Sequence, residues 1–133
     1  MQPIEWIRGK TVVGVERDDR GTTFHFDRGG ALRVECLWRI ITKGRVWLTS
    51  EDDLQTFGLL TPNDAGPAAF AMLVARVVTE CAVTPDTGDL SLSFAKSIRL
   101  ECIRDTSGYA RWQLTAPDGM QVIARGGDGL AEA

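Results

Sequence analysis

The sequence predicts a mainly β protein that also contains one or two short helices. Apolar residues alternate with polar residues in both halves of the chain, which is typical of strands with one buried face. Turn-forming stretches such as TPDTGD (84–89) and APDG (116–119) separate these runs. Between the two halves, residues 51–76 lose the alternation and carry helix signals instead. A chain of 133 residues fits one domain, so we expect residues 1–133 to form a single unit.

The first half, residues 10–50, predicts four strands joined by tight turns. Val13 and Val15 share one face of the first strand, and Phe24 and Phe26 share one face of the second. Residues 32–40 alternate without interruption and predict a third strand. RVWLT (45–49) follows the Lys43-Gly44 turn and predicts the fourth.

The connection over residues 51–76 predicts helix. Ser50, followed three residues later by Asp53, resembles a capping box at a helix start. Pro67 suits the first position of a helix because its missing N–H has no partner there. The apolar run 68–76 then predicts a short, mostly buried helix.

The second half, residues 77–125, repeats the plan of the first. LRVEC (32–36) recurs as IRLEC (98–102), and Trp38-Arg39-Ile40 matches Trp112-Gln113-Leu114. We therefore predict two duplicated four-stranded antiparallel meanders related by a pseudo-two-fold axis. They would pack as a sandwich or as a partly open barrel, since either hides strand edges. Residues 126–133 are expected to form a flexible tail.

Composition argues against several classes of function. The net charge of −3 does not suit a nucleic-acid groove, which requires a basic stripe. The N-terminus MQPIEWIRGK lacks the apolar run of a signal peptide, and no apolar stretch is long enough to cross a bilayer. Three cysteines without close spacing predict reduced thiols and a cytoplasmic location.

Catalytic, cofactor and metal sites are not predicted. The single histidine, His25, lies on the polar face of its strand, and nothing near it in sequence completes a nucleophilic triad. Cys36 and Cys102 share the parity of apolar neighbours, which predicts small buried side chains. Among these two and Cys81 there is no CxxC pair, so no zinc site is expected.

Aromatic and acidic residues are the candidates for a binding surface. Four tryptophans are many for a chain of this length, and tryptophan and tyrosine can anchor interfaces. Core positions compete with this interpretation, and Trp6 and Trp47 are expected to be the most exposed. The run at 51–53 is either a helix start or an acidic patch for a basic partner. The candidate binding residues are Trp6, Trp47, Glu51, Asp52, Asp53, Tyr109 and Trp112.

The second half resembles an uncharacterised bacterial family of small two-repeat β-rich proteins. The resemblance rests on TGDLSLSF (87–94), IRLEC (98–102), the Tyr-x-x-Trp motif at 109–112 and the Pro-Asp-Gly hairpin at 117–119. An acidic residue follows the tyrosine in that family, whereas this chain has Ala110. These motifs mark structure and carry no chemistry. Proteins of this type include immunity proteins of toxin systems, so the resemblance implies recognition by analogy only.

Two classes of function follow from these observations. A non-catalytic protein-binding module, immunity-type or regulatory, accords with the missing catalytic groups and the surplus tryptophan. The alternative is a small-molecule-binding, barrel-like protein or an unrecognised enzyme, which requires an apolar cavity lined by Trp38, Tyr109 or Trp112. A homodimer that joins sheet edges is a further possibility.

Overall fold

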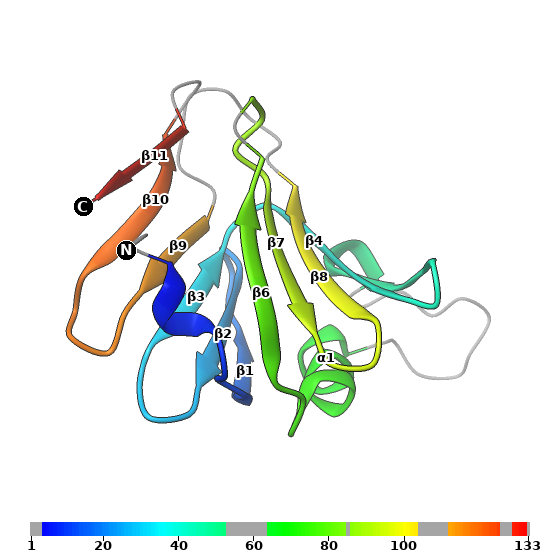
Figure 1. The fold of residues 1–133 in the computed structure, drawn as a ribbon. Helices are drawn as coiled ribbons and strands as arrows, with labels where there is room; N and C mark the ends of the chain where they lie inside the picture. Colours follow the sequence, from blue (N-terminus) through cyan, green and yellow to red (C-terminus); the bar gives the residue numbers. More distant parts are fainter. Residues whose placement is uncertain (1–3, 53–63, 85, 104–111, 126–128, 133) are drawn as a thin grey trace.

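Two antiparallel sheets form the framework of the protein (Figure 1). The computed structural model describes residues 4–52, 64–84, 86–103, 112–125 and 129–132. The first sheet has six strands in the order β1-β2-β3-β9-β10-β11. Their bounds are β1 Val12–Arg17, β2 Thr22–Phe26, β3 Ala31–Val34, β9 Trp112–Thr115, β10 Gln121–Arg125 and β11 Gly129–Glu132.

The second sheet has five strands in the order β5-β4-β8-β7-β6. Their bounds are β4 Leu37–Thr42, β5 Arg45–Thr49, β6 Val78–Val83, β7 Leu90–Phe94 and β8 Ile98–Ile103. The mainly β class is thus confirmed. Since the strands separate into two sheets with distinct edges, the described chain forms no closed barrel.

Each half of the chain contributes to both sheets, which corrects the prediction of two four-stranded units. The first half supplies three strands to one sheet and the β4–β5 hairpin to the other. The residues predicted as one strand over 32–40 form two strands, β3 and β4. After β3 the chain leaves the six-stranded sheet, passes through Glu35 and Cys36, and enters the five-stranded sheet at β4. Every second residue stays buried where the chain changes sheet, because Val34, Cys36 and Trp38 all face the same core. Alternation alone therefore could not reveal the break.

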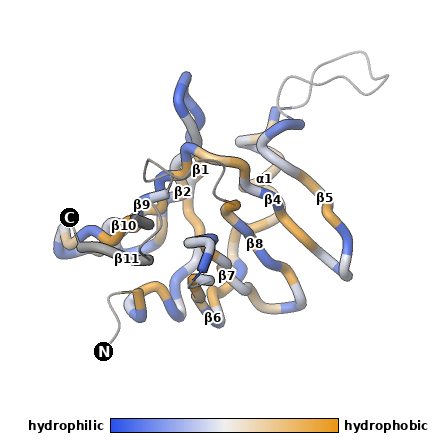
Figure 2. The backbone as a smooth tube through the Cα atoms, turned by 90° about the horizontal axis from the view of Figure 1, so that it is seen from above, coloured by the Kyte–Doolittle hydropathy of each residue, from blue (hydrophilic) through white to orange (hydrophobic). Residues whose placement is uncertain are grey.

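Short helices lie beside the sheets. Their bounds are η1 Glu5–Ile7, η2 Ser50–Asp52 and α1 Ala65–Leu73. Pro67 is the third residue of α1, within the first turn, where a missing N–H is tolerated. Helix α1 contacts both β1 and β5, and Figure 2 shows it between these edge strands of the two sheets. No helix of the described ranges is long and apolar enough to cross a membrane.

The C-terminal residues depart from the expected flexible tail. Residues Gly129–Glu132 form β11, which pairs antiparallel with β10 from Val122↔Glu132 to Arg125↔Gly129. The six-stranded sheet is therefore one strand wider at this edge than the sequence pattern predicts.

Two tryptophans are buried in the core of the protein. Trp38 on β4 is fully buried, and its indole Nε1–H donates to Thr22 Oγ1 at 3.0 Å. Trp112 on β9 is 1% exposed, and its Nε1–H donates to the Gly88 carbonyl oxygen at 2.8 Å. Both rings thus bury a large apolar area without leaving the polar N–H unsatisfied.

Candidate functional site

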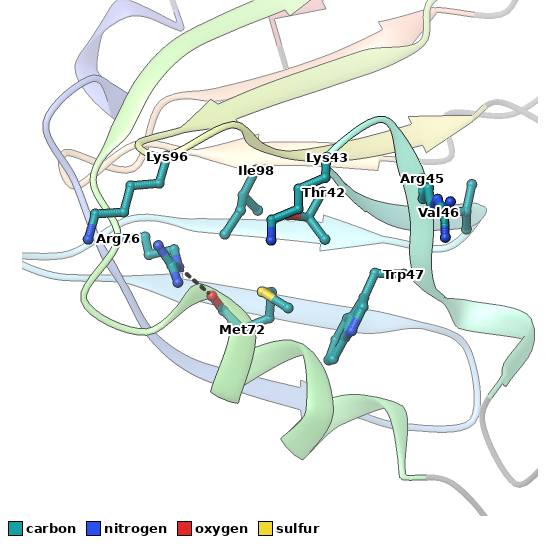
Figure 3. A pocket seen from close by; sticks show the side chains of 9 residues that line it. All are labelled: Thr42, Lys43, Arg45, Val46, Trp47, Met72, Arg76, Lys96 and Ile98. Atoms are coloured by element: carbon teal, nitrogen blue, oxygen red, sulfur yellow. Dashed lines mark hydrogen bonds between the residues drawn. The ribbon is translucent and has the colours of Figure 1, made fainter.

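An open hollow lies where two hairpin turns of the five-stranded sheet approach the end of α1 (Figure 3). We call it the cationic cleft. It has a volume of about 880 Å³. Residues from β4, β5, α1, β8 and the connecting turns line it: Thr42, Lys43, Arg45, Val46, Trp47, Met72, Arg76, Lys96 and Ile98.

Four of the lining residues carry positive charge, and none of the nine is acidic. Lys43 lies in the β4–β5 turn and Lys96 lies in the β7–β8 turn, and the side chain of Lys43 extends toward the hollow in Figure 3. Arg45 belongs to β5, and Arg76 follows α1. Because the whole chain has a net charge of −3, this cluster is opposite in sign to the average surface.

The cleft cations also differ from the arginines elsewhere in their partners. Arg33 donates to both carboxylate oxygens of Asp18 at 2.8 Å, and Arg39 and Arg99 share Glu101 at 2.7 and 2.8 Å. By contrast, Lys43, Arg45 and Lys96 make no side-chain hydrogen bond or ion pair with any residue in the described ranges. The cleft therefore presents positive charge that the described protein does not neutralise.

The side chain of Arg76 is held at the end of α1 by a hydrogen bond to the helix backbone. Its Nε donates to the Met72 carbonyl oxygen at 2.9 Å, the bond drawn in Figure 3. This carbonyl belongs to the last turn of the helix, where carbonyls lack intrahelical partners and the helix dipole favours a cation. The bond uses Nε alone, so the terminal amino groups take no part in it.

Left-handed backbone positions gather around the cleft. Lys43 has φ 54°, Lys96 has φ 67° and Ser97 has φ 62°, although none of them is glycine. Ala75, which precedes Arg76, has φ 63°. Such positions disfavour residues with a β-carbon and often mark functional sites. Asparagine or glycine would suit these turns better, so the lysines are held there at a conformational cost.

A β-bulge explains the position of Trp47. Ile40 pairs with Leu48 and Ile41 pairs with Val46, so Trp47 is an extra residue on β5. Bulges at sheet edges turn side chains away from the regular alternation. Trp47 is accordingly 47% exposed, and Figure 3 shows its ring extending from β5 toward the side of the cleft formed by α1.

Apolar surface forms the rest of the cleft. Val46 is 53% exposed, Met72 on α1 is partly buried, and Ile98 is 3% exposed. Together with Trp47, these side chains offer hydrophobic contact beside four charges. This combination fits an anionic ligand that also carries an apolar group.

The other predicted site residues lie elsewhere. Trp6 is partly buried and meets Phe26 edge to face, with ring centroids 6.0 Å apart. Trp112 is buried, so its ring is not a surface anchor. Glu51 and Asp52 belong to η2, where the Asp52 carboxylate accepts the Thr49 N–H at 3.0 Å.

Asp53 and Tyr109 lie outside the described residues. Of the five predicted binding residues that the structure describes, Trp47 alone lines the cleft. The four cations are dispersed between positions 43 and 96, so no local motif announces them. The Lys43-Gly44 turn and Trp47 were the local signals near the site.

The nucleophile candidates are in unreactive surroundings. Burial, with a smaller effect of Glu5, raises the pKa of the Cys81 thiol to about 12. Burial also raises the pKa of Cys102 well above its ordinary value. His25 Nε2 lies 3.2 Å from Glu16 Oε1, but its geometry does not make a hydrogen bond. In the described ranges, no three His, Cys, Asp or Glu residues are grouped as metal ligands.

Comparison with known proteins identifies a family without an assigned activity. No curated protein and no solved structure matches the chain. The model of a family of unknown function, DUF6188, matches residues 3–132. Since that match covers nearly the whole chain, this protein belongs to the DUF6188 family.

Proposed function

We propose that this protein is a non-catalytic protein-binding module that recognises an acidic segment of its partner through the cationic cleft. One observation carries the proposal: four cations from three separate parts of the fold line the same cleft as Trp47, and none of the nine described lining residues is acidic. An acidic segment would neutralise this charge, and charge complementarity would guide its approach. The expected role is immunity-type or regulatory, in which binding occludes the partner.

Three features support recognition over catalysis. The Cys81 thiol, with a pKa of about 12, stays protonated at neutral pH and is a poor nucleophile. His25 is on β2 beside Glu16 and does not line the cleft. The cleft itself offers charge and apolar contact, which are the components of a recognition surface.

The proposed setting is a bacterial cytoplasm. In the structure, no disulfide joins Cys36, Cys81 and Cys102, which accords with a reducing compartment. An acidic protein segment suits such a setting better than a nucleic acid does, because the net charge of −3 repels a long polyanion.

We also propose that the two halves are copies related by a pseudo-two-fold axis. Each sheet contains three strands of one half and a hairpin of the other. The hairpin β9–β10 of the second half joins β1-β2-β3, and the hairpin β4–β5 of the first half joins β6-β7-β8. β1 has a bulge between Val12 and Gly14, and β6 has one between Val78 and Glu80. At the junction of the two sheets, Thr11 and Val77 form an antiparallel bridge with each other.

The strand register suggests how the copies correspond. Val34 pairs with Trp112, and Cys102 pairs with Trp38. By strand pairing, Val34 is therefore the counterpart of Cys102. Alignment of LRVEC with IRLEC instead matches Cys36 with Cys102, so the two correspondences differ by two residues. A slip of two residues preserves strand parity, so the sequence pattern alone cannot detect it.

Fluorescence anisotropy with labelled peptides tests the binding function. We expect a glutamate-rich peptide to bind the wild-type protein at low salt and a lysine-rich peptide of the same length to fail. Replacing Lys43→Asn and Lys96→Asn together should abolish most of this binding. Arg28→Asn is the matched control, because Arg28 has φ 58° in another hairpin turn and does not line the cleft. Equal binding of both peptides, or an equal loss in the control, would contradict the proposal.

A further inference from the structure

The cleft contains more apolar surface than the binding of charge requires. Trp47 and Val46 are about half exposed on an edge strand, and Met72 is partly exposed beside them. Exposed apolar groups gathered in one concave place mark interaction surfaces, whereas scattered ones do not. A purely acidic chain would leave these groups in contact with water.

Under the proposed correspondence of the two halves, the counterpart of the cleft is the corner formed by Trp6 and Gly30, called here the Trp6 corner. There, Trp6 in η1 precedes the buried Val12 of β1, as Met72 in α1 precedes the buried Val78 of β6. Each lies six residues before its valine. The indole of Trp6 covers Gly30 so closely that a β-carbon on that glycine would lie 2.6 Å from Trp6 Cζ3.

The cleft lacks such a ring at the corresponding place. Gly30 follows Phe26 by four residues, and Ile98 follows Phe94 by four residues. Under the proposed correspondence, Met72 and Ile98 in the cleft are therefore the counterparts of Trp6 and Gly30. An indole is larger and flatter than a methionine side chain, so the cleft stays open where its counterpart is filled.

Charge also separates the two corners. Near Trp6, Lys10 is 8% exposed, and its Nζ donates to the Asp27 carbonyl oxygen at 2.9 Å. Arg28 in the adjoining turn is paired with Asp27 at 3.0 Å. The cations of the Trp6 corner are thus satisfied within the protein, while those of the cleft face an unfilled hollow.

We propose that the ligand of the cleft is an acidic peptide segment with an aromatic side chain among its carboxylates. The inference rests on the proposed function and adds an aromatic side chain that anchors the peptide in the cleft. The aromatic ring enters beside Trp47 and Met72 and takes the place that Trp6 fills in the other corner. The flanking carboxylates pair with Lys43, Lys96 and the cleft arginines. Methionine and tryptophan both make favourable contacts with aromatic rings.

Two peptides that differ at one position test this inference on the wild-type protein. Both are glutamate-rich nonapeptides carrying the same fluorophore, one with a central tryptophan and the other with a central serine. Burial of the ring should make the tryptophan peptide bind about tenfold more tightly. Equal affinities would overturn the anchor and leave the proposed function standing, whereas no binding of either peptide would overturn both.

A variant that fills the cleft provides a second test. Met72→Trp places an indole where Trp6 lies in the other corner and should reduce binding of the tryptophan peptide at least tenfold. Met120→Trp is the control, because Met120 is 49% exposed in the β9–β10 turn and does not line the cleft. Circular dichroism and thermal unfolding establish that both variants fold. Unchanged affinity in a folded Met72→Trp variant would overturn the inference.

Other occupants are distinguished in the same assay. A single-stranded RNA with the same label, if bound more tightly than the tryptophan peptide, would overturn the inference in favour of a nucleic acid. A concentration-dependent dimer in sedimentation, abolished by Met72→Trp but not by Met120→Trp, would identify a second copy of the chain as the occupant and likewise overturn it.

Discussion

Replacing the two turn lysines of the cleft by asparagine should raise stability while it lowers affinity. Lys43 and Lys96 occupy left-handed positions, with φ 54° and 67°. A β-carbon in this region costs about 1 kcal/mol, and asparagine recovers about half of it because it tolerates the conformation. Lys43→Asn and Lys96→Asn should therefore each stabilise the fold by about 0.5 kcal/mol.

The combined gain is measurable. Two independent sites add, so the double variant should gain about 1 kcal/mol. For a chain of this size, that corresponds to a rise in Tm of about 4 °C. Asparagine is preferred over glycine in this test because it retains the β-carbon, and the conformational freedom of the unfolded chain changes little.

Thermal unfolding and peptide binding are measured on the same samples. Arg28→Asn is again the control, because its φ of 58° predicts a similar gain in stability without loss of binding. The exposed ion pair of Arg28 with Asp27 should contribute little. The reasoning is refuted if the double variant is less stable than the wild type, or if it is more stable and binds the acidic peptide unchanged.

The remaining predictions concern the framework that supports the cleft. Thr22→Val removes the buried acceptor of the Trp38 indole N–H and should lower the free energy of unfolding by about 2 kcal/mol. Thr22→Ser keeps the hydroxyl and should lower it by about 1 kcal/mol because a buried methyl is lost. Urea unfolding of both variants measures the difference. Equal losses would show that the hydrogen bond contributes nothing. Hydrogen bonds from Arg33 lower the pKa of Asp18, so the stabilisation is present above the ordinary pKa of 3.8 and is lost as the pH falls below it. Asp18→Asn should therefore show a smaller loss of stability between neutral and acid pH than the wild type does, and identical acid profiles would exclude the ion pair as a contributor. Because the pKa of Cys81 is about 12, a thiol reagent at pH 8 should label the folded protein slowly and the unfolded protein fast, and rapid labelling of Cys81 in the folded state would disprove its burial.

Local patterns were sufficient to predict most strands. The alternation of Phe24 with Phe26, and of Leu90 with Leu92, corresponds to the observed burial in β2 and β7. The hairpin at Lys43-Gly44 was also predicted, because a glycine in a left-handed turn is a local requirement. These features depend on nearest neighbours, and the sequence carries them directly.

The binding site was predicted poorly. Trp47 was expected on the surface, but the sequence offered no reason to associate it with Lys43, Lys96 and Arg76. These residues meet because β4 and β5 join the sheet of the second half, next to the end of α1. The acidic run at 51–53 is a helix start or an acidic patch by sequence, and the structure shows a local contact there, in which Asp52 accepts the Thr49 N–H.

By itself, the sequence determined the mainly β class, the positions of the turns and most of the residues that face the core. Val13 was wrongly predicted on the apolar face of its strand: it is 54% exposed, because the bulge in β1 turns Val12 into the core instead. The tertiary structure decided that the chain changes sheet between β3 and β4, that Trp47 occupies a bulge, and that four dispersed cations surround one hollow. The physical reason is that the alternation of apolar and polar residues indicates which side of a strand is buried. It carries no information about which strand pairs with it. The cleft depends on strand order, because it lies where the β4–β5 hairpin joins β8 in the five-stranded sheet, beside the end of α1.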